Sequence, residues 1–110
     1  MSLRTAQQRS EICTSCPVAK VADRFGDSYT LLIVRDLMDG PKRFGALEES
    51  LSGISSRTLC KKLKALEDEG LVTRTEFRER PPRVEYRLTK KGAAFHSVVD
   101  AMRSYGKKYL

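Results

Sequence analysis

The chain has 110 residues, 40% of them hydrophobic, and carries 21 lysines and arginines against 14 acidic residues, a net charge of +7. This length predicts a single domain over residues 1–110 with a modest core, and no second domain is expected. No apolar run reaches the roughly 20 residues of a membrane span and no signal-peptide core is present, which excludes a membrane protein and predicts a cytoplasmic one.

The basic excess is concentrated in two segments. Residues 1–40 have no net charge, whereas residues 41–64 and residues 78–91 each carry six basic and two acidic side chains, net +4. Two separated basic segments in one small domain indicate two contact elements on a single nucleic acid.

The N-terminal part of the chain predicts a polar arm followed by two helices. The arm covers residues 1–15. A helix is expected to begin at Pro17 with Cys16 as its N-cap, because proline favours the first helical position, and to end at Gly26. Residues 28–39 are apolar almost all round, which predicts a second helix within the core.

The most informative pattern lies at residues 55–69. Leu59, Leu63 and Leu66 recur there at helical spacing, and Ser55 is a suitable N-cap, so we expect an amphipathic helix. Its early turns are basic and its last turn is acidic, which opposes the helix dipole but suits a helix whose N-terminus meets phosphates. A basic face that contacts only solvent is the alternative interpretation.

The residues before this helix predict a helix-turn-helix motif. Phe44, Leu47 and Leu51 have the spacing of one helix face, and a short link that contains Gly53 follows them. A helix, a tight turn and a second helix with basic early turns are typical of a motif that inserts its second helix into the DNA major groove.

A two-stranded wing is predicted over residues 71–89. Two segments rich in β-branched and aromatic residues are joined there by an arginine-rich connection. Such a wing can reach the DNA backbone or the minor groove beside the helix.

Residues 90–110 predict one C-terminal helix, capped by Thr89, with an apolar stripe that is long for so small a domain. The stripe comprises Phe95, Val98, Val99, Met102, Tyr105 and Tyr109. We expect it both to pack on its own core and to form a dimer. The predicted fold class is therefore α+β, mainly α: a winged helix-turn-helix core over residues 16–92, with a two-stranded wing and terminal dimerisation helices.

Four segments in this order resemble the HxlR-type winged helix-turn-helix transcriptional regulators of bacteria and archaea. They are CPV at 16–18, YTLLIVRDLMDGPKRFGAL at 29–47, GISSRTLCKKLKALEDEGLV at 53–72 and PPRVEYRLTKKG at 81–92. The resemblance covers about residues 16–110, and Tyr29 stands where the family usually has tryptophan. It implies a transcriptional regulator that binds double-stranded DNA sequence-specifically, as a homodimer joined through its terminal helices on a pseudo-palindromic operator.

The resemblance also implies which side chains face DNA. On the predicted recognition helix they are Ser55, Ser56, Arg57, Thr58 and Lys61. One arginine before the motif is expected near a phosphate, and three arginines are expected in the wing; these are Arg43, Arg78, Arg80 and Arg83. All of these positions lie within the two basic segments, so composition and resemblance indicate the same regions.

Cys16 is a candidate redox sensor. An N-cap sulfur would sit against unpaired N–H groups at the positive end of the helix dipole, which favours the thiolate. Some HxlR-type regulators resemble this arrangement and use the matching cysteine to sense oxidants or electrophiles, so a redox or small-molecule signal is one hypothesis. The alternative is a buried, inert cysteine. Cys13 could resolve an oxidised Cys16 or link two chains, and Cys60 is the less favoured sensor.

An enzyme, a metal site and a different binding module are the competing interpretations. The sole histidine, His96, has no suggested partner group, so no catalytic set is expected. Cys13 and Cys16 have zinc-ligand spacing but no second pair follows, so neither a metal nor another cofactor is expected. A winged-helix protein-interaction or RNA-binding module without operator specificity is the remaining alternative, although the basic segments lack exposed aromatics for base stacking.

Overall fold

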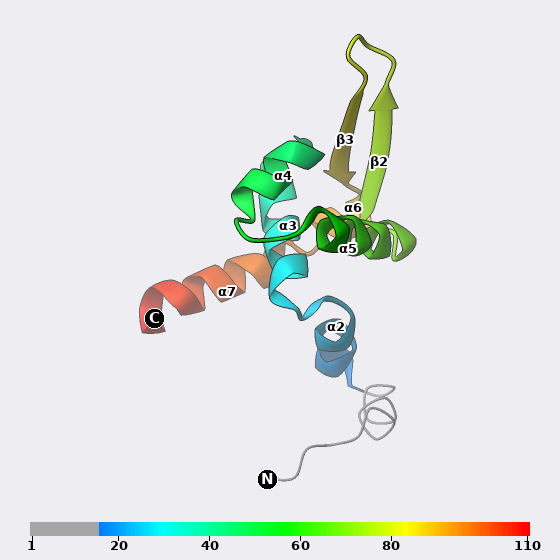
Figure 1. Cartoon of the computed structure of the whole chain (residues 1–110). Helices are drawn as coiled ribbons and strands as arrows, with labels where there is room; N and C mark the ends of the chain where they lie inside the picture. The colour runs from blue at the N-terminus through cyan, green and yellow to red at the C-terminus, as the bar shows by residue number, and fades with distance from the viewer. Residues whose placement is uncertain (1–15) are drawn as a thin grey trace.

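The computed structural model describes residues 16–110; the predicted arm and Cys13 lie outside the described residues. The elements follow in the order α2 Pro17–Phe25, α3 Ser28–Leu37, β1 Lys42–Arg43, α4 Phe44–Ser50, α5 Ser56–Asp68, β2 Val72–Phe77, β3 Arg83–Leu88, α6 Lys90–Ala93 and α7 His96–Tyr109. Figure 1 shows the β2–β3 hairpin projecting from one side of the helices and α7 leading away on another. The mainly helical chain with one small antiparallel sheet confirms the predicted winged helix-turn-helix class.

The core lies where α3, α4 and α5 meet the base of the hairpin. Helix α3 is apolar almost all round, as predicted, and its Ile33 is fully buried. Helix α4 adds Leu47, and α5 presents the predicted leucine stripe, in which Leu59 is also fully buried. Since these helices bury their apolar faces against one another, their polar faces are left at the surface.

Local signals define both ends of α5. The Ser55 side chain accepts the Thr58 N–H at 3.0 Å, so Ser55 is the N-cap. At the other end Gly70 has φ +80°, and the Leu71 N–H donates to the Leu66 carbonyl at 2.9 Å. This is a Schellman C-cap, in which a glycine takes the left-handed conformation that other residues avoid.

The sheet has three strands, one more than the sequence predicted. Strand β1 pairs antiparallel with β3, so that Lys42 lies opposite Tyr86 and Arg43 opposite Glu85, and the strand order is β1-β3-β2. A two-residue strand is too short to show an alternating pattern in the sequence, and β1 forms only by pairing with the distant β3. The extra strand connects the beginning of α4 directly to the wing.

The predicted single helix over residues 90–110 is two helices, α6 and α7. Thr89 caps the first of them, through the Gly92 N–H at 3.1 Å, as expected. Gly92 packs so closely on Leu71 that an added Cβ would overlap the Leu71 carbonyl oxygen. The chain then turns at residues 94–95, which places the Phe95 ring edge-on against Phe25 with centroids 5.9 Å apart. Within residues 16–110, no helix is long and apolar enough to cross a membrane.

Candidate nucleic-acid interface

The outward face of α5 carries the predicted pair of cations, Arg57 and Lys61. Both side chains are exposed and lie opposite the buried leucines, one helical turn apart. Within residues 16–110 neither takes part in an ion pair, whereas Lys62 and Lys64 of the same helix both do. Unpaired guanidinium and ammonium groups beside a helix N-terminus are suited to phosphates and to base acceptors.

The hydroxyl groups of the first turn already have partners within the protein. Ser55 caps the helix, and its Oγ also donates to Thr58 Oγ1 at 2.8 Å. Ser56 Oγ donates to Glu48 Oε2 of α4 at 2.6 Å. Glu48 was not among the residues predicted from sequence, and no local signal identifies it because the contact spans the turn of the motif.

The wing presents two of its three predicted arginines to solvent. Arg78 and Arg80 lie exposed in the loop between β2 and β3, at the outer end of the hairpin in Figure 1. Arg83 is held instead at the base of this loop. Its guanidinium lies 3.1 Å from a Glu79 carboxylate oxygen and 4.2 Å from the centroid of the Phe77 ring.

Neighbouring charges on the sheet are also mostly paired. Arg83 contacts Glu85 as well, at 3.6 Å. A hydrogen bond to Glu76 at 2.8 Å raises the pKa of Arg74 above its ordinary value, and a further contribution comes from Tyr86. Arg43 lies exposed in β1 at the start of α4 and, within residues 16–110, forms no ion pair. Exposed cations that form no ion pair within residues 16–110 are therefore found on α5, at the start of α4 and at the wing tip.

Two contacts hold the C-terminal end of α5. Arg24 Nε of α2 lies 3.8 Å from a Glu69 carboxylate oxygen. Lys91 Nζ of α6 donates to the Glu69 carbonyl oxygen at 2.6 Å. A lysine on the last carbonyls offsets the unfavourable position of the acidic residues there.

Cys16 is the N-cap of α2, as predicted. Its Sγ accepts the Ala19 N–H at 3.5 Å, and the side chain is partly exposed. Cys16 and Cys60 are both free thiols. Among the described residues no group of three or more His, Cys, Asp or Glu side chains is placed to hold a metal ion.

An apolar groove of about 430 Å³ separates α2 from α7. Helix α2 has no buried residue and lines the groove with Val18 and Val21. The opposite wall includes Val98 and Met102 of α7. The groove therefore joins the helix headed by Cys16 to the C-terminal helix.

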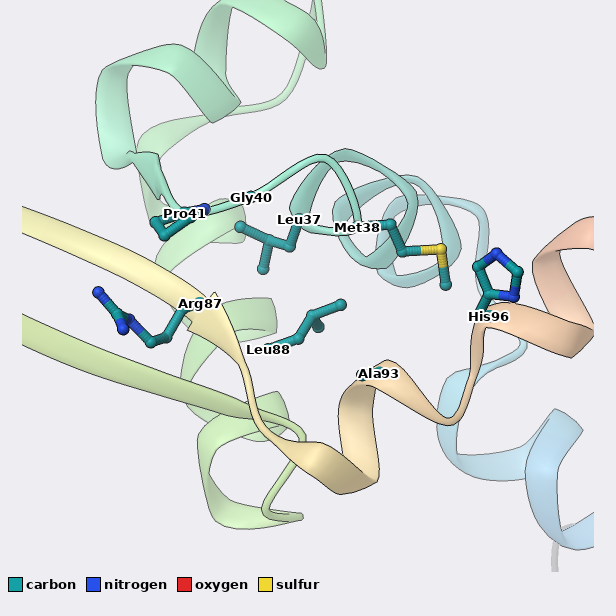
Figure 2. A pocket seen from close by; sticks show the side chains of 8 residues that line it. All are labelled: Leu37, Met38, Gly40, Pro41, Arg87, Leu88, Ala93 and His96. Atoms are coloured by element: carbon teal, nitrogen blue, oxygen red, sulfur yellow. The ribbon is translucent and has the colours of Figure 1, made fainter.

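A second pocket, of about 390 Å³, lies between the end of α3, β3 and the start of α7 (Figure 2). Leu37, Met38 and Leu88 are among its apolar lining residues, and His96 lies at one side. The sequence suggested no partner group for His96, but in the structure His96 Nε2 lies 3.0 Å from Asp100 Oδ2. The two side chains are exposed and one helical turn apart, an ordinary contact on a helix surface.

Comparison with known proteins assigns the family. The family model described as HxlR-like helix-turn-helix matches residues 24–110. The uncharacterized HTH-type transcriptional regulator sll1512 of Synechocystis is 38% identical over 95 residues, which are 86% of this chain and 70% of that protein. The HTH-type transcriptional regulator YodB of Bacillus subtilis is 37% identical over 97 residues, 87% of each chain. The solved structure of the redox regulator HypR in its oxidized form aligns with a TM-score of 0.81 and 32% identity, over 86% of this chain and 98% of that one. The chain therefore belongs to the HxlR family and is a transcriptional regulator with a helix-turn-helix DNA-binding fold.

Proposed function

We propose that two copies of the chain bind a pseudo-palindromic operator in double-stranded DNA, each with one α5 helix and one wing. The observation that carries this proposal is the pair of exposed cations, Arg57 and Lys61, which lack ion-pair partners within residues 16–110 on a helix whose other lysines are paired. Arg78 and Arg80 supply a second contact at the wing tip. Such a regulator works beside the chromosome, in the cytoplasm of the cell.

A homodimer through α2 and α7 is supported by the apolar surface that these helices leave exposed. Val18 is 77% exposed, Met102 50% and Tyr105 61%, on two helices that line one groove. Figure 1 shows α7 standing away from the rest of the chain, so its far half has room for a second copy. A two-fold dimer would place the two α5 helices on half-sites about one turn of DNA apart, roughly 34–36 Å between centres.

Control of the dimer by oxidation or by an electrophile at Cys16 is the second part of the proposal. Cys16 heads α2, and α2 forms one wall of the apolar groove. A modified Cys16 would therefore act on the proposed dimer contact. HypR, a similar protein, is named a redox regulator.

Selection of bound duplexes from a random DNA pool, followed by sedimentation of the complex, tests the proposal. We expect an inverted repeat and two protein chains per site. Single-stranded DNA and duplex RNA at the same salt concentration should compete poorly. A Met102→Glu variant should sediment as a folded monomer and lose most operator affinity, because a carboxylate would enter the apolar groove.

The matched control is Ser104→Glu, which adds the same charge to the exposed opposite side of α7. This variant should dimerise and bind as the wild type does. A selected site without inverted symmetry, or equal binding of duplex RNA, would favour a protein-interaction or RNA-binding module instead.

A further inference from the structure

The hydrogen bond between Ser56 and Glu48 determines what Ser56 can offer to DNA. Ser56 is exposed in the first turn of α5, and its hydroxyl donates to Glu48 Oε2 at 2.6 Å. An ionised carboxylate only accepts hydrogen bonds, and a serine hydroxyl has a single proton. Once that proton is on Glu48, the Ser56 oxygen presents only lone pairs to an approaching molecule.

The neighbouring groups of the same turn differ from Ser56 in this respect. Arg57 can only donate hydrogen bonds. The Ser55 hydroxyl donates its proton to Thr58 Oγ1, which leaves the Thr58 proton for another acceptor. Ser56 is therefore an acceptor among donors at the N-terminus of α5.

The position of Glu48 is not explained by the stability of its own helix. Glu48 lies in the last turn of α4, where a negative charge opposes the helix dipole. Within residues 16–110 it forms no ion pair, and its bond to Ser56 is exposed. A carboxylate beside a DNA-facing turn also repels phosphates, which lowers affinity for every sequence.

We propose that Glu48 is a specificity-determining residue that fixes Ser56 as a hydrogen-bond acceptor for a base amino group in the major groove. The inference rests on the proposed function, in which the first turn of α5 faces base edges. Adenine N6 and cytosine N4 are donors there, whereas thymine O4 and guanine O6 are acceptors. An acceptor-only Ser56 pairs with adenine or cytosine and is repelled by the keto edge of thymine or guanine. Glu48 thus lowers the affinity for every DNA sequence but increases the discrimination between bases at one position.

The test compares Glu48→Gln with Glu49→Gln on the selected operator and on its single-base variants at one salt concentration. A glutamine at position 48 can donate as well as accept, so Ser56 becomes free to donate. Wild type should prefer adenine or cytosine at one position of each half-site by roughly 3- to 10-fold, the worth of one hydrogen bond. Glu48→Gln should reduce this preference to less than about twofold, because a Ser56 hydroxyl that is free to donate or to accept can pair with either kind of base edge. Preferences at the other positions should stay unchanged.

Glu49→Gln is the matched control, because Glu49 is the adjacent exposed carboxylate of α4. Removing either charge should raise the overall affinity for duplex DNA, but only Glu48→Gln should also erase the base preference. Ser56→Ala should erase it too, and adding Glu48→Gln to that variant should change it no further. If a site-selective wild type and both glutamine variants share one base preference profile, the role of Glu48 is overturned while the proposed function stands. If the wild type shows no base preference on duplex DNA, the proposed function fails first and the inference fails with it.

Discussion

Lys62 Nζ lies 3.1 Å from Asp27 Oδ2 and so ties α5 to the residue that begins α3. Asp27 is the N-cap of α3, with the Thr30 N–H at 3.1 Å and the Thr30 hydroxyl at 2.6 Å from its carboxylate oxygens. Burial raises the pKa of Asp27, but the two hydrogen bonds from Thr30 and the Lys62 ammonium outweigh it and lower the pKa below its ordinary 3.8. Lys62 therefore positions the helix, while Arg57 and Lys61 remain for an external partner.

Replacing Asp27 should separate its charge from its role as a cap. Asp27→Asn keeps a good N-cap and should lower the free energy of unfolding by at most about 1 kcal/mol, the worth of a partly exposed ion pair. Asp27→Ala loses the cap as well and should lower it by about 1–2 kcal/mol. Urea denaturation at pH 7 measures both values.

The contribution of Asp27 to the free energy of unfolding should depend on pH. Because the folded state lowers the pKa of Asp27, its contribution is complete above about pH 4, the unfolded value, and is lost as the pH falls through the lower folded value. The gap between wild type and Asp27→Asn should shrink towards zero on acidification. Lys64→Met, which breaks the exposed Lys64–Asp68 pair, is the control and should change stability by only a few tenths of a kcal/mol. If the difference in free energy of unfolding between wild type and Asp27→Asn grew as the pH fell, the folded state could not lower the pKa of Asp27.

Arg57 and Arg80 should contribute to binding in different ways. Arg57→Ala, on the face of α5, should cost about 1–3 kcal/mol on the preferred operator and relax the preference at particular base pairs. Arg80→Ala, at the wing tip, should weaken binding to all sequences similarly, because a phosphate contact carries no base information. Titrations against operator and scrambled duplex distinguish the two patterns.

The salt dependence of operator binding should show how many DNA phosphates the protein neutralises. With about four phosphates per protomer, the dimer would show a slope of log K against log salt near −7, which is about −0.9 for each of eight phosphates. Arg80→Ala should reduce the slope by about 2 in a dimer, since each copy loses one contact. A slope near zero would mean that the basic segments do not contact DNA.

Arg83 should affect the wing itself more than the DNA contact. Its guanidinium lies over the Phe77 ring and between the carboxylates of Glu79 and Glu85. Arg83→Met should therefore lower the free energy of unfolding by about 1 kcal/mol and leave two carboxylates unpaired in the wing. Arg78→Ala, the control, should weaken DNA binding without changing the melting temperature. If Arg83→Met melted as the wild type does but lost DNA binding as Arg78→Ala does, Arg83 would contact DNA directly.

Sequence reasoning succeeded where the determining signal is local. The N-cap Ser55 and the leucine stripe of α5 each depend on residues within one or two helical turns, and the structure has both. The N-cap role of Cys16 was predicted in the same way, from the proline that follows it. Such signals persist because capping and amphipathic periodicity act over a few residues.

The features that sequence reasoning missed depend on residues far apart in the chain. The Glu48–Ser56 bond crosses the turn of the motif, and β1 forms only because β3 lies beside it. The division between α6 and α7 lies at residues 94–95, just after the close contact of Gly92 with Leu71, and no helical pattern reveals either feature. Counting the charge of Arg83 likewise could not show that neighbouring carboxylates neutralise it.

Oxidation of Cys16 should change operator affinity. Peroxide or diamide treatment of wild type should shift the operator Kd by roughly tenfold, within the usual range of coupling between two sites. The physical reason is that Cys16 begins α2, which has no buried residue of its own and lines the apolar groove with α7. A covalent change at the cap therefore acts on a weakly packed helix at the proposed dimer contact. Binding titrations before and after treatment, and after a thiol reductant, measure the shift and its reversal.

Cys16→Ser is the decisive variant because serine is itself a good N-cap, so α2 keeps its start while the thiol is lost. Its operator affinity should equal that of the reduced wild type and should not respond to oxidant. Cys60→Ser, which removes the exposed thiol of α5, should respond as the wild type does. A non-reducing gel shows whether the oxidised product is a cross-linked dimer, and Cys13→Ser shows whether that second thiol takes part. If the response survives in Cys16→Ser and disappears in Cys60→Ser, the sensing thiol lies on α5, and Cys16 serves only to cap α2.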